Sequence, residues 1–125
     1  MRRPMIQIFM SLALVGATLL FVAADAPKAT VKGYVLDSAC VFTKDLKKPV
    51  STECALSCAR AGSPLVILAE DGTIYWPIAG TIPADGQNSK LLPFAGEKVV
   101  ASGRVYERGG SKAIVIDKID KQDAK

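Results

Sequence analysis

Apolar and polar positions alternate along much of the chain, which is typical of strands that bury one face. The clearest alternation lies near the C-terminus, where Ala113 and Val115 point one way and Ile114 and Ile116 point the other. A continuous apolar run before Asp71-Gly72 predicts a buried strand that ends in a hairpin turn. These patterns predict five strands, at residues 30–37, 64–69, 73–78, 97–107 and 112–119.

One short helix is predicted between the first two strands. Ser51 or Thr52 can cap its N-terminus, and Gly62 can end it in the left-handed conformation. Residues 38–50, which contain Cys40, are predicted to form a loop. Five strands in about 90 residues, with a single intervening helix, favour a mainly β fold, a small and partly open antiparallel barrel.

The first 24 residues have the features of a secretory signal peptide. Arg2 and Arg3 precede an apolar run over 5–22, and small side chains allow cleavage near Ala24. The alternative is an uncleaved anchor, because a run of 18 residues is at the short limit for crossing a bilayer. We expect an exported protein, periplasmic or secreted, with no membrane span in the mature chain. The expected divisions are a signal peptide (1–24), a polar lead (25–29), a barrel domain (30–120) and a flexible tail (121–125).

Export changes the charge of the working protein. Removing 24 of 125 residues leaves 101, and the loss of Arg2 and Arg3 reduces 16 basic residues to 14 against 12 acidic ones, a net charge of +2. Lysines and acids are interspersed along the remaining chain. This composition argues against nucleic acid as a partner.

The absence of histidine narrows the chemistry further. The sequence contains no histidine, and its three methionines all lie in the predicted signal peptide. Catalysis by Ser-His-Asp or Cys-His groups is therefore excluded, as is haem held by His or Met. We expect a non-enzymatic protein whose chemistry depends on Cys40, Cys54 and Cys58.

A soft-metal site is the leading interpretation of these cysteines. Cys54 and Cys58 are four residues apart, so they share one face of the predicted helix. Together with Cys40 they can hold Cu(I) in a trigonal site, or Zn(II) with Asp37, Glu53 or water as the fourth ligand. Ligand softness places copper slightly ahead of zinc.

A disulfide is the alternative, because cysteines of exported proteins are usually bonded. Cys40 would pair with Cys54 or Cys58, which stabilises a domain of this size by about 3 kcal/mol. The protein would then be a structural or interaction module of the cell envelope. It would be a monomer, or a dimer linked by a disulfide through the remaining cysteine. Thiol redox activity is a third interpretation, since Cys54 lies in the first turn of the helix, where its pKa would fall.

Three segments carry a resemblance to a group of known proteins. They are Gly33 to Cys40 (Gly-x-Val-x-Asp-x-x-Cys), Cys54-Ala55-Leu56-Ser57-Cys58, and a strand from Gly96 to Val105. In these segments the chain resembles small exported bacterial proteins with an OB-fold-like barrel, and the resemblance covers most of residues 31–119. In many such proteins a histidine shortly precedes the helix, whereas this chain has Ser51-Thr52-Glu53. The departure weakens a metal site inferred from the resemblance.

The resemblance also indicates a face for a ligand or partner. OB-like barrels often bind ligands on the face formed by strands 2 and 3. The second predicted hairpin strand contains Tyr75 and Trp76, which are adjacent and therefore point to opposite faces of the sheet. We expect one of them in the core and the other on a surface that contacts a ligand or an envelope protein.

Overall fold

The computed structural model describes residues 25–44 and 51–123. The predicted signal peptide (1–24) and part of the predicted loop (45–50) lie outside these residues, as does the end of the predicted tail. Within the described ranges, no helix is both long and apolar enough to cross a membrane.

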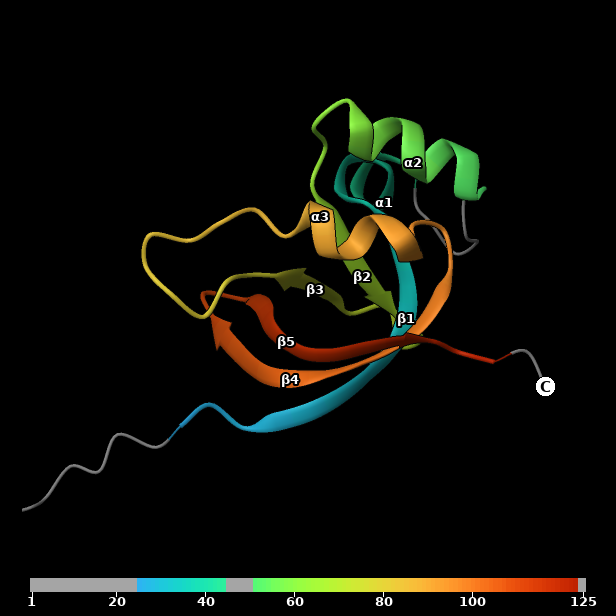
Figure 1. Cartoon of the computed structure of the whole chain (residues 1–125). Helices are drawn as coiled ribbons and strands as arrows, with labels where there is room; N and C mark the ends of the chain where they lie inside the picture. Colours follow the sequence, from blue (N-terminus) through green and yellow to red (C-terminus); the bar gives the residue numbers. More distant parts are fainter. Residues whose placement is uncertain (1–24, 45–50, 124–125) are drawn as a thin grey trace, which may run out of the picture.

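Five strands form the body of the molecule, which confirms the predicted mainly β barrel (Figure 1). Each strand pairs with two neighbours, so the sheet closes on itself in the order β1-β2-β3-β5-β4. This is a five-stranded barrel of the OB type. The strands are β1 (Lys28–Asp37), β2 (Leu65–Ala69), β3 (Ile74–Pro77), β4 (Lys98–Arg108) and β5 (Ser111–Lys121).

Two details of the predicted barrel are wrong: it is closed rather than partly open, and one strand pair is parallel. β3 and β5 run parallel, whereas the other four pairs are antiparallel. The reason is geometric, because a closed ring with an odd number of strands cannot alternate direction throughout. Two strands are longer than predicted, since β1 begins at Lys28 in the predicted lead and β5 continues to Lys121 in the predicted tail.

Glycines allow the barrel to close at two points. Gly33 pairs with Ala69 of β2 on one side and with Val99 of β4 on the other, so β1 belongs to both halves of the sheet. A Cβ added to Gly33 would overlap the backbone of β2. Gly103 lies at a register shift between β4 and β5, which confirms the bend or bulge expected there.

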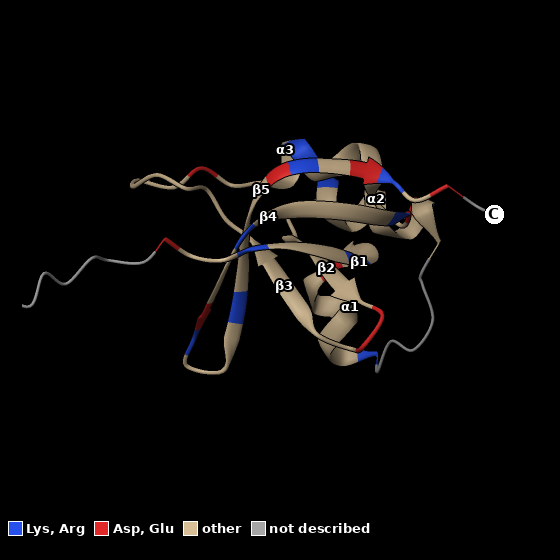
Figure 2. Ribbon diagram, turned by 90° about the horizontal axis from the view of Figure 1, so that it is seen from below, with Lys and Arg blue, Asp and Glu red and all other residues tan. Residues whose placement is uncertain are grey.

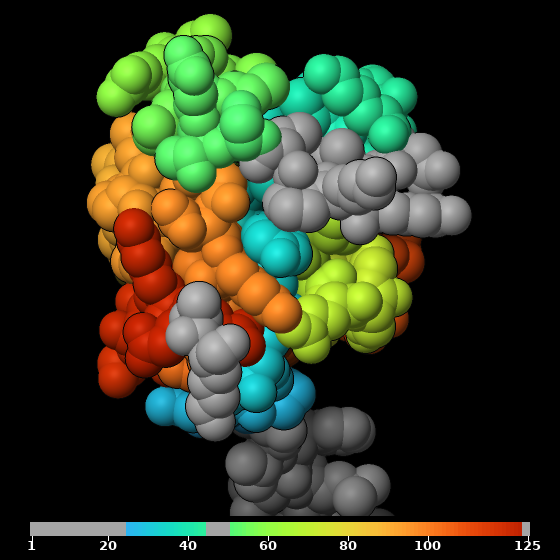
Figure 3. Space-filling view, turned by 90° about the vertical axis from the view of Figure 1, so that its right-hand side faces the viewer, coloured from blue at the N-terminus to red at the C-terminus, as the bar shows by residue number. Residues whose placement is uncertain are grey.

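Two helices, rather than the single one predicted, connect β1 to β2. α1 (Ser38–Thr43) carries Cys40 and α2 (Thr52–Arg60) carries the other two cysteines. Both helices lie against one end of the barrel (Figure 1), and in the space-filling view the green residues of α2 cover the end of the molecule above β4 (Figure 3). The sequence pattern did not predict α1, because this helix is six residues long and includes Val41 and Phe42, which favour strands.

α2 packs on the main hydrophobic core through its small residues. Ala55 and Ala59 are buried one turn apart and contact a cluster that includes Ile67, Leu91 and Ile114. The expected cap is confirmed at Ser51, and Gly62 has the expected positive φ of 102°. Because Cys54 and Cys58 each precede a buried alanine, they form a second line along the helix, beside its core-facing side.

The segment between β3 and β4 crosses the barrel and supports the start of β2. It contains α3 (Asn88–Leu91) and a 3-10 turn, η1 (Leu92–Phe94). The Asn88 side chain bonds to both ends of a short loop: its Oδ1 accepts from Leu65 N at 2.9 Å, and its Nδ2 donates to Ser63 O at 2.7 Å. The loop between α2 and β2 is therefore held by a residue more than 20 positions away.

Candidate metal centre

Asp37 ends β1 and begins α1, and its side chain is almost completely buried. Its exposed fraction is 2 %, the lowest of any charged residue in the described core. One carboxylate oxygen, Oδ1, accepts a hydrogen bond from Cys40 N at 2.8 Å and so caps α1. The other, Oδ2, is buried and makes no hydrogen bond of good geometry with a described residue, although the Ser63 hydroxyl and the Cys40 thiol lie near the carboxylate. A buried carboxylate oxygen with no partner is costly, and it is a free electron-pair donor.

Asp37 is nevertheless ionised at neutral pH. Burial by itself raises the pKa of this carboxyl group. The Ser63 hydroxyl and the backbone and thiol of Cys40 act in the opposite direction, and together they hold the pKa of Asp37 below its ordinary value. The site therefore contains a negative charge before any cation binds.

Cys40 lies three residues after Asp37, on the buried side of α1. Its exposed fraction is 7 %. Burial, hydrogen bonding to Asp37 and the negative charge of that carboxylate raise the pKa of the Cys40 thiol to about 11. Without a cation the thiol is therefore neutral at neutral pH, and a cation that binds it must displace its proton.

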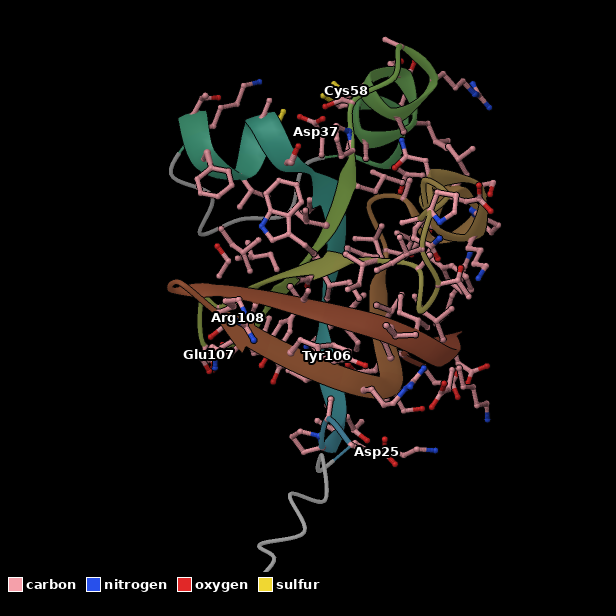
Figure 4. The ribbon with its side chains drawn as sticks, turned by 90° about the vertical axis from the view of Figure 1, so that its left-hand side faces the viewer. Asp25, Asp37, Cys58, Tyr106, Glu107 and Arg108 are labelled. Atoms are coloured by element: carbon pink, nitrogen blue, oxygen red, sulfur yellow. The ribbon has the colours of Figure 1, made fainter. Side chains whose placement is uncertain are left out.

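Strand register brings Cys58 to the same place. Asp37 pairs with Leu65 at the start of β2, and Ser38 N donates to Pro64 O at 2.9 Å. At the other end of this loop, Ser63 N donates to Cys58 O at 3.1 Å. The last turn of α2 is consequently tied to the end of β1, and Figure 4 shows Cys58 next to Asp37, between α1 and α2.

The three side chains form one cluster of metal-ligating atoms. A carboxylate oxygen of Asp37 and the Sγ atoms of Cys40 and Cys58 all lie within 4.8 Å of one another. In a tetrahedral zinc site, Zn–S bonds of about 2.3 Å place sulfur ligands about 3.8 Å apart. The cluster needs to contract by about 1 Å or less to reach that geometry. It is the one such group of three or more candidate ligands in the described part of the chain.

Two of the candidate ligands lie outside this cluster. Cys54 is half-buried in the first turn of α2, one turn before Cys58, and Glu53 beside it is exposed. Four residues separate Cys54 from Cys58, which at a rise of 1.5 Å per residue is about 6 Å along the helix axis, and the Cys54 sulfur is not part of the cluster. The structure thus combines Asp37 with two of the three cysteines.

The cysteines are not joined to one another. All three are free thiols in the structure, so neither of the disulfides considered from the sequence is present. Cys40 and Cys58 are close enough to bind the same metal ion, but they are not bonded to each other.

Tyr75 and Trp76 occupy opposite sides of β3, as their adjacency predicts. Tyr75 packs against the main core, whereas Trp76 packs on a second cluster formed by Leu36 and Val66 and stacks on Phe42. Sequence reasoning missed Phe42, because the residue was assigned to a loop. It also missed Ser63, which reaches Asp37 only through the fold.

The fold and the cluster define a small β-barrel protein with a candidate metal centre at one end of the barrel. Comparison with family models, with curated proteins and with solved structures finds no match to this chain.

Proposed function

We propose that this chain is an exported, non-enzymatic metal-binding protein whose Asp37, Cys40 and Cys58 side chains bind a zinc ion. The observation that carries the proposal is the cluster of one carboxylate oxygen and two thiol sulfurs within 4.8 Å. Zinc accepts both kinds of ligand, in a tetrahedral site that a fourth donor such as water completes. Cu(I) is supported less well than the sequence suggested, because it prefers sulfur and a carboxylate is a hard ligand.

Metal titration of the protein purified under anaerobic conditions tests this assignment. We expect one equivalent of Zn(II), and Co(II) in its place should give a thiolate charge-transfer band with the intensity of two thiolates. Cys40→Ser and Cys58→Ser should each weaken zinc binding by at least tenfold, since each removes a ligand. Cys54→Ser is the matched control, because it changes a cysteine of the same helix outside the cluster, and it should bind zinc as the unmodified protein does.

Several results would contradict the proposal. A band with the intensity of three thiolates, lost in Cys54→Ser, would favour the three-cysteine site. Cu(I) bound more tightly than Zn(II) in a competition assay would change the metal. A Cys40–Cys58 disulfide in freshly purified protein, with no metal uptake after reduction, would instead support a disulfide-stabilised module of the envelope.

Export is proposed from the N-terminal sequence, with its basic start, apolar run and small residues before Asp25. Expression of the full chain in a bacterial host followed by mass spectrometry of the periplasmic fraction tests it. We expect a chain that begins at Asp25. Full-length protein retained in the membrane fraction would indicate an anchor.

A further inference from the structure

A second feature lies on the opposite side of α1 from the metal cluster. Phe42, two residues after Cys40, is 63 % exposed, which is unusual for a side chain of this size. Its ring is stacked on that of Trp76 in β3, with the ring centroids 6.3 Å apart and an angle of 25° between the planes. The two nearly parallel rings form an aromatic patch, and Phe42 is its more exposed member.

This aromatic patch is one wall of a groove with a volume of about 430 Å³. The volume lies within the range of about 300–1,000 Å³ that is typical of small-molecule sites. Three separate parts of the chain line the groove: α1, the β2–β3 hairpin and the start of β5. We call it the aromatic groove, and its main lining residues are Phe42, Thr73, Ile74, Trp76, Ser111 and Lys112.

The rest of the groove is polar but nearly neutral. Thr73 and Ser111, which both carry hydroxyl groups, line it together with the aromatic residues. Lys112 is the one charged side chain among the described residues that line the groove, and its Nζ lies 3.6 Å from Glu107 Oε2. The charge on Lys112 is therefore balanced within the protein. Figure 2 likewise shows basic and acidic residues side by side along β4 and β5 rather than gathered in one region.

Two glycines without side chains flank the groove. Gly72 and Gly110 lie in the two hairpin turns beside it, with φ values of 87° and 79°. Nothing lies within 4 Å of the position that a Cβ would take at either glycine. A ligand longer than the groove can extend past both turns, and in Figure 4 the labelled Glu107 and Arg108 show the end of β4, where the β4–β5 turn begins.

We propose that the aromatic groove binds a neutral oligosaccharide, with a sugar ring stacked on Phe42 and Trp76 and hydroxyl groups bonded to Thr73, Ser111 and Lys112. A pyranose ring has a flat apolar face and a polar edge, which matches a groove lined by both aromatic rings and hydroxyl-bearing residues. A nucleic acid would require unpaired basic residues along its phosphates, and the described residues that line this groove include none. A peptide that adds to the sheet as a further strand would require a free strand edge, and the barrel is closed.

The single tryptophan makes the proposal testable directly. Because the sequence contains only one tryptophan, Trp76, its fluorescence reports on this groove alone. Cellohexaose and chitohexaose, both neutral, would be titrated into the full chain, with a chelator and then with zinc. We expect a saturable change in emission with at least one of them under both conditions, so the result does not depend on the metal proposal.

Variants locate the binding and exclude a folding defect. Phe42→Ala should weaken binding by at least tenfold, because it removes half of the stacking surface. Trp76→Phe, followed by calorimetry, should weaken it as well. Ile82→Ala is the matched control: Ile82 is a fully exposed apolar residue outside the groove, so its loss should leave the affinity unchanged. Thermal unfolding of each variant verifies that the barrel is intact.

Three outcomes would overturn the proposal. The first is no saturable binding of either hexasaccharide at millimolar concentration. The second is binding that Phe42→Ala leaves unchanged. The third is concentration-dependent dimerisation in sedimentation experiments that Phe42→Ala abolishes, which would make the groove a contact between two copies of the chain.

Discussion

At the scale of single residues, burial and the neighbouring Asp37 together keep the Cys40 thiol neutral. The carboxylate caps α1 through the backbone of Cys40, and its negative charge contributes to a thiol pKa of about 11. A thiolate is the reactive form of cysteine, so at pH 8 about one molecule in 10³ is reactive at this position. The reactivity of Cys40 is therefore a direct measure of its surroundings.

We predict that Asp37→Asn accelerates the alkylation of Cys40. The variant keeps an oxygen that can cap the helix and removes the charge, so the pKa of Cys40 should fall and the thiolate fraction should rise. The rate of reaction with iodoacetamide at pH 8 should increase several-fold, measured by mass spectrometry in a Cys54→Ser, Cys58→Ser background with a chelator present.

Glu53→Gln is the control for this experiment, since it neutralises an exposed carboxylate outside the cluster. It should leave the rate unchanged. Equal rates in Asp37→Asn and in the parent background would show that burial alone raises the pKa of Cys40, and would remove Asp37 from the electrostatics of the site.

The sequence indicated the chemistry of this site better than it indicated which residues form it. The lack of histidine and of methionine after the signal segment pointed to the cysteines, and Asp37 was named as a candidate ligand. Helical spacing placed Cys54 and Cys58 on one face, but it could not show which turn of α2 reaches β1. That choice depends on the pairing of Asp37 with Leu65, a contact between residues distant in the sequence.

At the scale of secondary-structure elements, Asn88 of α3 holds the loop that connects the metal cluster to β2. Asn88→Ala leaves Leu65 N and Ser63 O without their partners, and Leu65 is only 2 % exposed. We predict a decrease of about 2 kcal/mol in the free energy of unfolding, because an unpaired buried backbone group costs about that much. Ser89→Ala, at the exposed next position, should change it by less than about 0.5 kcal/mol.

Denaturant unfolding of both variants with a chelator measures this difference. Zinc affinity should also decrease in Asn88→Ala, since Ser63 and the start of β2 position Asp37. A loss of stability no greater than that of Ser89→Ala would show that the two hydrogen bonds do not hold the loop.

A second prediction for the secondary-structure elements concerns the bend at Gly103. A Cβ at this position would overlap the carbonyl oxygen of Val115 on β5, so β4 and β5 would have to separate. Gly103→Ala should lower the free energy of unfolding by about 3 kcal/mol. Gly86→Ala is the matched control, because a Cβ there meets nothing within 4 Å, and a similar loss in both variants would contradict the explanation.

The strands were predictable because their signal is local. Alternation and the glycine turns located all five to within a few residues, and the bulge at Gly103 was expected. The parallel pairing of β3 with β5 was not, because it depends on ring closure rather than on any segment. α1 was missed for another reason: a six-residue helix has little periodicity, and its capping residue, Asp37, is also the last residue of β1, as predicted.

At the scale of the whole molecule, α1 stands between the two candidate sites. Cys40 faces the metal cluster, whereas Phe42 faces the aromatic groove and stacks on Trp76 of β3. Val41 between them packs on the second hydrophobic cluster with Leu36. A cation bound by Cys40 and Cys58 would therefore join α1 to α2 and restrict the motion of α1, which is only six residues long.

We predict that zinc raises the thermal stability of the whole barrel and most strongly protects α1. A ligand at 100 times its dissociation constant stabilises the folded state by about 2.7 kcal/mol, which for about 100 residues corresponds to a rise in Tm of about 10 °C or more. Hydrogen exchange should slow most in α1 and in the last turn of α2. Cys40→Ser should abolish both effects and Cys54→Ser should retain them, with Mg²⁺ producing neither. Protection spread evenly over the barrel, with α1 unchanged, would show that zinc binds elsewhere.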